Sequence, residues 1–205
     1  MLTLYYSPGS CARASHITLS ETGTLFKAER ISFADNQQRS PEFLKINPKG
    51  RVPALITDQG ILTETPAILI YLAQSFPAAK LAPTDPFALA KAQSFNSYLC
   101  STVHVSHAHK FRGARWADDP AAIEAMKLKV TENMTTGLEL IEHDLLKGPW
   151  VLGDAYSVCD AYLFTIACWL EGDGVEVTKL PRVMDHHRRM KERPAVQSVL
   201  LAEAS

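Results

Sequence analysis

The stretch Tyr5-Tyr6-Ser7-Pro8-Gly9-Ser10-Cys11-Ala12-Arg13-Ala14 decides the fold, because a short apolar run ends in it and a helix begins. Residues 2–6 have the composition of a β-strand, and the Pro-Gly pair that follows is typical of a turn. Residues 12–22 form a helix-like run that stops at Gly23, a common residue at helix C-termini. The chain is therefore predicted to start with a strand–turn–helix unit.

Cys11 is the most informative residue of this unit, because it stands where the predicted helix starts. Unpaired backbone N–H groups and the positive end of the helix dipole meet at such a position. Both favour the thiolate, so we expect Cys11 to ionise near neutral pH. The alternative is a buried cysteine that only packs, since free cysteine is among the most buried residue types.

The next fifty residues continue the alternation of strand-like and helix-like runs. The predicted elements are a strand at 26–31, a helix from Ser40-Pro41, a hairpin of 52–57 with 61–62, and a helix capped by Thr63 that runs to about Ser75. The order β-α-β-α-β-β-α predicts an α/β sandwich with a mixed sheet.

Strand patterns are missing after a proline-rich stretch, which contains Pro77, Pro83 and Pro86. We expect an α/β domain at 1–77, a linker at about 78–86 and an all-helical domain at 87–205. Its helices are predicted at 87–114, along the apolar stripe from Ile123 to Leu145, at 157–170, at 180–193 and at 195–201. The 157–170 helix starts with the capping box Ser157-Val158-Cys159-Asp160 and is apolar on every face, so it should be buried at the centre.

The composition is typical of a globular protein: 205 residues, 46% hydrophobic and 21% charged. The net charge of −1 provides no basic face for nucleic acid. No apolar stretch is long enough for a membrane span, and the N-terminus lacks the features of a signal peptide. The four cysteines form no CxxC pair, so we expect free thiols in a reducing cytoplasm.

Three segments of the first domain are predicted to converge. The first is Ser10-Cys11. The second is Arg51-Val52-Pro53, where a proline at the start of a strand is a candidate for a cis bond that leaves the Val52 backbone free to pair with an extended peptide. The third is the helix start Thr63-Glu64-Thr65, whose N–H groups and hydroxyl suit a carboxylate and whose Glu64 suits an ammonium. Together they describe a site for glutathione.

On these motifs the sequence resembles the cytosolic glutathione S-transferases, most like the bacterial beta class. The matching segments are Tyr5 to Cys11, Ile46 to Leu55, Leu62-Thr63-Glu64 with Ala67-Ile68, and Asp160 to Phe164. The resemblance implies a thioredoxin-like N-terminal domain, an all-α C-terminal domain, a homodimer in the cytoplasm, and conjugation of the co-substrate glutathione to small hydrophobic electrophiles.

The resemblance also implies roles for individual residues. Cys11, with Ser10 or Tyr6 as alternatives, faces the glutathione sulfur, and His104 lies near that sulfur. Glutathione itself is held by Phe33, Asn36, Arg51, Val52, Pro53, Glu64, Thr65 and Ser97. Asn36 and Ser97 stand where the beta class usually has lysine and asparagine, and Val105, Thr102 and Ala12 also depart from its pattern. Arg51 is a candidate to replace a missing cation.

Two other functions stay open at this level. Cys11 could form a mixed disulfide with glutathione and serve thiol transfer or peroxide reduction, with glutathione as the resolving thiol. The fold could also serve as a non-catalytic module that binds ligands or proteins. Cys100, His104 and His107 share a helical face, but they lack a fourth metal ligand, and we expect no metal site. Trp169 is predicted to lie in the core.

Overall fold

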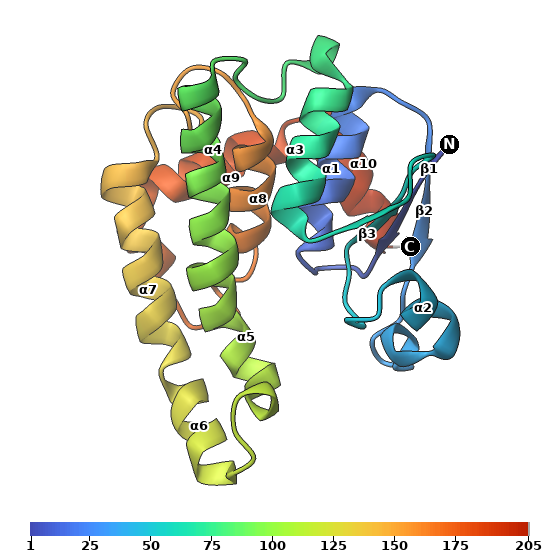
Figure 1. Cartoon of the computed structure of the whole chain (residues 1–205). Coiled ribbons are helices and arrows are strands. Elements are labelled where there is room, and N and C mark those ends of the chain that lie inside the picture. The colour runs from blue at the N-terminus through green and yellow to red at the C-terminus, as the bar shows by residue number, and fades with distance from the viewer. Residues whose placement is uncertain (205) are drawn as a thin grey trace.

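The computed structural model describes residues 1–204, which form an α/β part and a larger helical part (Figure 1). The α/β part consists of β1 (Leu2–Tyr6), α1 (Ala12–Thr22), β2 (Phe26–Arg30), α2 (Pro41–Ile46), β3 (Ala54–Ile56), β4 (Ile61–Thr63) and α3 (Thr65–Ser75). The strand order is β2-β1-β3-β4, with β1 and β2 parallel and the other two pairs antiparallel. This is the predicted mixed sheet, and the thioredoxin-like fold class is confirmed.

The first helix confirms its predicted bounds, because α1 spans Ala12–Thr22 and ends at Gly23. Gly23 has a φ of 70°, the left-handed conformation that glycine adopts without steric cost. The third helix differs from the prediction. It starts at Thr65 with Glu64 at the N-cap, whereas Thr63 is the last residue of β4 and so cannot cap it.

The helical part begins after a short connection. It contains α4 (Pro86–Tyr98), α5 (His104–Arg112), α6 (Pro120–Leu128), α7 (Val130–Leu140), α8 (Val158–Ala167), α9 (Pro181–Lys191) and α10 (Pro194–Ala204). A π-helical turn, Leu99–Val103, joins α4 to α5, and a second, Ile141–Leu145, extends α7. In the described residues 1–204, no helix combines the length and apolar character needed to cross a bilayer.

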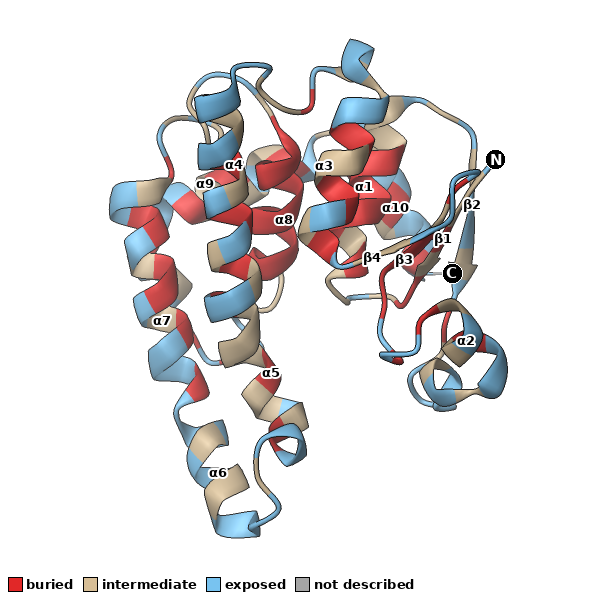
Figure 2. Ribbon diagram, viewed as in Figure 1, coloured by how far each residue is buried: buried red, intermediate tan, exposed pale blue. Residues whose placement is uncertain are grey.

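The apolar stripe from Ile123 to Leu145 is divided between two helices rather than lying on one. The break falls at Lys129, whose N–H bonds back to the carbonyl of Met126 three residues earlier and so tightens the turn. Only the stripe residues from Val130 onwards lie in the core, whereas α6 extends beyond it (Figure 2). Core packing therefore supports α7 but not the continuation of one straight helix.

The α8 helix is the centre of the molecule, as predicted, and all ten of its residues are buried. Its capping box is present, with Ser157 and Asp160 exchanging hydrogen bonds at the N-terminus. Burying side chains such as Tyr162 and Phe164 contributes about 1.5–3 kcal/mol each. The α8 helix packs against α1, and α1 also contacts α3 and α10 (Figure 1). These contacts join the sheet part to the helical part beside the N-terminus of α1.

Candidate active site

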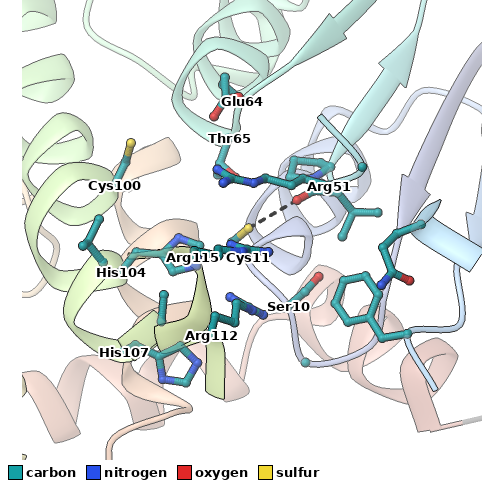
Figure 3. A pocket seen from close by; sticks show the side chains of 18 of the residues that line it. Ser10, Cys11, Arg51, Glu64, Thr65, Cys100, His104, His107, Arg112 and Arg115 are labelled. Carbon is teal, nitrogen blue, oxygen red and sulfur yellow. Dashed lines mark hydrogen bonds between the residues drawn. The ribbon is translucent and has the colours of Figure 1, made fainter. Parts of the chain in front are cut away.

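A cleft of about 470 Å³ lies between the two parts of the chain (Figure 3). One wall is formed by the loop before α1, the segment that leads into β3 and the start of α3. The other wall is formed by α5 and the turn after it. Of the residues predicted from the sequence, the cleft is lined by Ser10, Cys11, Phe33, Arg51, Val52, Pro53, Glu64, Thr65 and His104. All three converging segments therefore contribute to one site.

Two predicted residues, Asn36 and Ser97, are not among those that line the cleft. Asn36 has a left-handed φ of 57°, and its side-chain oxygen accepts a hydrogen bond from the amide of Gln38. Gln38 lines the cleft instead. Ser97 is exposed on α4, about one helical turn before Cys100, which does line the cleft.

Cys11 lies at the N-cap of α1 and directs its thiol towards Val52, with 3.6 Å between Sγ and the Val52 carbonyl oxygen (Figure 3). The Val52–Pro53 bond is cis, as the sequence predicts. Burial raises the pKa of the Cys11 thiol, and the hydrogen bond with the Thr65 side chain and the charge of Arg112 only partly oppose it. The expectation that Cys11 ionises near neutral pH is therefore wrong. The free-energy cost of desolvating a thiolate is larger than the stabilisation that the helix N-terminus gives to its charge.

Ser10 and Tyr6, the two alternatives to Cys11, occupy different positions. The Ser10 hydroxyl donates to the Ser7 carbonyl at 2.6 Å and accepts a hydrogen bond from the N–H of Ala12 at 3.3 Å, so it lies in the turn before α1, at the edge of the cleft. Tyr6 is buried, with its ring 4.9 Å from that of His16, and is not a lining residue. Of these two, only Ser10 can reach a ligand in the cleft.

Glu64 has the unusual φ of 75° and lies at the N-cap of α3. Its carboxylate forms an ion pair with Lys49, which also donates to the Thr63 hydroxyl at 2.7 Å. The side chain is more than half exposed, so the carboxylate is open to a ligand's ammonium. The first N–H groups of α3 lie beside it and suit a carboxylate.

On the opposite wall, His104 contacts the indole of Trp169, with 5.0 Å between ring centroids. His107 stacks on the same indole at 4.2 Å, and its Nδ1 lies 2.6 Å from a carboxylate oxygen of Asp173. These contacts engage His107 with partners other than a metal. Across residues 1–204, no group of three or more His, Cys, Asp and Glu is arranged to hold a metal ion.

The pKa of His104 is lowered to about 3, chiefly by burial and then by Arg112 and other nearby cations. In the unfolded chain a histidine titrates near 6.5, so below that pH the unfolded state binds more protons than the folded state. We expect the free energy of unfolding to fall by about 1–2 kcal/mol more between pH 7.5 and pH 5 in the wild type than in His104→Gln. Urea unfolding at the two pH values measures this, and an equal loss in both proteins would contradict the neutral His104.

Gly9 is held from both sides by residues distant in the sequence. The Trp169 indole N–H donates to the Gly9 carbonyl at 2.8 Å, and the Gly9 N–H donates to Glu203 at 2.9 Å. Glu203 also pairs with Arg13 at 2.6 Å. Sequence reasoning missed Glu203 and placed Trp169 in the core. No local pattern links Gly9 with a glutamate 194 residues away.

Replacing Glu203 with glutamine should lower the free energy of unfolding by about 2–3 kcal/mol, because the Glu203 carboxylate is 4% exposed and its loss leaves the charge of Arg13 uncompensated. Since Gly9 directly precedes Ser10-Cys11, the activity should fall as well. Urea unfolding measures the first effect. The control is Glu192→Gln, which breaks an exposed pair with Arg188 and should change stability by less than about 0.5 kcal/mol.

The chain is similar to known proteins along almost its whole length. Residues 1–74 match the family model described as "Glutathione S-transferase, N-terminal domain". The glutathione S-transferase GstA of Escherichia coli O157:H7 is 33% identical over 98% of both chains. Among solved structures, a glutathione transferase homolog from Sulfitobacter with bound glutathione is 44% identical, with a TM-score of 0.94 over 97% of this chain and 96% of that one. A beta class enzyme from Sphingomonas chungbukensis is 34% identical, with a TM-score of 0.85 over 98% of both chains.

The chain combines a thioredoxin-like sheet with a helical part that closes a cleft at the N-terminus of the first helix. The full-length match at 33% identity goes further: this chain belongs to the glutathione S-transferase family. It is a glutathione transferase, and the enzyme class predicted from the sequence is confirmed.

Proposed function

We propose that the enzyme binds glutathione along the wall formed by Ser10-Cys11, Val52 and Glu64-Thr65, lowers the pKa of its thiol, and adds the thiolate to an electrophile in the same cleft. The observation that carries the proposal is the shared lining of one cleft by these three segments. The Val52 N–H has no hydrogen-bond partner within residues 1–204, so it is available to a peptide laid against it.

Each end of glutathione has a matching group. The ammonium of the γ-glutamyl residue suits Glu64, and its carboxylate suits the Thr65 hydroxyl and the first N–H groups of α3. The cysteinyl backbone would pair with Val52. Arg51, whose side chain has no ion pair within residues 1–204, suits the glycine carboxylate.

The thiol is activated by donors that stabilise its anion. Cys11 stays protonated at neutral pH because burial raises its pKa, so its S–H can donate to the glutathione sulfur. His104, neutral because its pKa is about 3, adds a second candidate donor from the opposite wall. In the reaction a bond forms between this sulfur and the electrophilic carbon, the leaving group departs from that carbon with the bonding electrons, and the thiol proton passes to solvent.

The finer assignments rest on the family resemblance. The likeness to a beta class structure supports placing this enzyme in that class, and we expect a homodimer in the cytoplasm with division into domains at 1–77 and 87–205.

The test of the proposal is calorimetric titration with glutathione together with turnover of a chloronitroaromatic electrophile. Binding with turnover supports the transferase; a chain that does neither would instead be a binding module.

A further inference from the structure

Three arginines at the cleft carry positive charge that no carboxylate of residues 1–204 pairs with. Arg51 stands on one wall, and Arg112 and Arg115 stand on the other (Figure 3). Within residues 1–204 none of these three guanidinium groups forms an ion pair or a side-chain hydrogen bond. The carboxylate that lines the cleft, that of Glu64, forms its ion pair with Lys49 and not with any of these arginines, and its exposed side chain stays open to a ligand's ammonium.

The three arginines lie close enough to affect one another and their neighbours. Arg51, Arg112 and Arg39 each lower the pKa of Arg115, after the effect of burial, and Arg115 nevertheless stays charged at neutral pH. Like charges held together without an internal partner favour an anion from solution. Guanidinium groups are suited to this task because they bind carboxylate and phosphate through paired N–H donors.

Glutathione accounts for only part of this charge. It carries two carboxylates and one ammonium at neutral pH. In the proposed binding mode the γ-glutamyl carboxylate binds at the start of α3, and the glycine carboxylate binds Arg51. Arg112 and Arg115 then remain, on the wall opposite the proposed glutathione site, next to the half-exposed ring of Trp116. Phe33 supplies a second partly exposed ring to the same cleft.

We propose that the electrophile of this enzyme carries an anionic group, a carboxylate or an equivalent oxyanion, on a flat unsaturated framework, and that Arg112 and Arg115 select it. The inference rests on the proposed function and adds the class of the second substrate. Arg112 and Arg115 are specificity residues here: they bind the charge, Trp116 packs on the framework, and the sulfur attacks the activated carbon.

The test compares two electrophiles that differ only in charge, 4-chloro-3,5-dinitrobenzoate and the neutral 4-chloro-3,5-dinitrobenzamide. In both, the glutathione sulfur bonds to the ring carbon, chloride leaves with the bonding electrons, and the thiol proton goes to solvent. The measured quantity is the ratio of kcat/KM for the acid to kcat/KM for the amide. Comparing this ratio between variants cancels differences in intrinsic reactivity and in the amount of folded protein.

We expect Arg112→Gln and Arg115→Gln each to lower the ratio about tenfold, which corresponds to about 1.4 kcal/mol, and the double variant to lower it about 30-fold or more, because each variant loses a hydrogen bond to a charged group. The control is Arg188→Gln, which removes one charge from the exposed face of α9 and should leave the ratio unchanged. In Arg115→Lys the acid-to-amide ratio should stay close to the wild-type value at low salt and fall well below it at high salt.

Three results would overturn the proposal. An unchanged ratio with a raised KM for glutathione would assign the two arginines to the glycine carboxylate. If glutathione binds but neither electrophile turns over, titration with the two preformed glutathione conjugates replaces kinetics, and equal affinities would contradict selection of the anion. Calorimetry that detects no glutathione binding at all would remove the proposed function, and this inference with it.

Discussion

Replacing Asp160 with alanine is expected to lower the free energy of unfolding by about 3–5 kcal/mol. The Asp160 carboxylate is fully buried and accepts hydrogen bonds from the N–H groups of Val151 and Ser157, both at 2.7 Å. It also accepts a hydrogen bond from the Ser157 hydroxyl at 3.1 Å, and His186 Nε2 lies 3.0 Å from Oδ1. Alanine would leave all of these buried groups without a partner, because water does not reach them. Urea unfolding followed by circular dichroism measures the change.

Two control variants separate the contribution of the Asp160 carboxylate to stability from that of the rest of the capping box. Ser157→Ala removes only the hydroxyl that caps α8 and should cost about 1 kcal/mol. Asp185→Asn, on the exposed part of α9, should change stability by less than about 0.5 kcal/mol. If Asp160→Ala lowered the free energy of unfolding by no more than Ser157→Ala does, Asp160 would not hold Val151 and His186 in place.

Replacing Cys11 with alanine is expected to lower kcat/KM for conjugation about tenfold, because the glutathione thiolate loses the S–H donor nearest the start of α1. Cys11→Ser restores an O–H donor at the same position and should recover most of the activity. Steady-state kinetics with a chloronitroaromatic electrophile measure the effect. Protein stability should change by less than about 1.5 kcal/mol in the serine variant, which keeps the volume nearly unchanged.

The same variants test the redox alternative. A thiol transferase that works through a mixed disulfide needs a Cys11 thiolate, and burial disfavours that ion. We therefore expect conjugation to exceed reduction of a glutathione mixed disulfide in the wild type. Full loss of conjugation in Cys11→Ser, alongside rapid disulfide reduction by the wild type, would reverse this assignment and make Cys11 a nucleophile.

Local patterns predicted the parts of the fold that depend on neighbouring residues. The bounds of α1, the glycine that ends it, the cis Val52–Pro53 bond and the Ser157–Asp160 capping box are all present. Each depends on interactions within a few positions of the chain. The strand and helix order was enough to predict the mixed sheet and the helical part.

Two errors were local: Thr63 does not cap α3, and the stripe from Ile123 to Leu145 is divided between two helices. The other errors concern burial and contacts between residues far apart in the sequence. The ionisation of Cys11 depends on how deeply the helical part covers it, which its own segment does not encode. The contact of Glu203 with Gly9 and the position of Trp169 in the cleft depend on how the two parts pack. Arg112 and Arg115 on the opposite wall were also missed. No motif in α5 or in the turn after it marks these two residues.

We infer that the cleft at the N-terminus of α1 makes the glutathione sulfur anionic, and the proposed conjugation depends on this ionisation. The ultraviolet absorbance of the thiolate, titrated against pH with glutathione bound to the wild-type enzyme, measures this directly. We predict a titration midpoint at least about one pH unit below 8.5, the usual value for an unperturbed thiol. A midpoint equal to that of free glutathione would contradict the account.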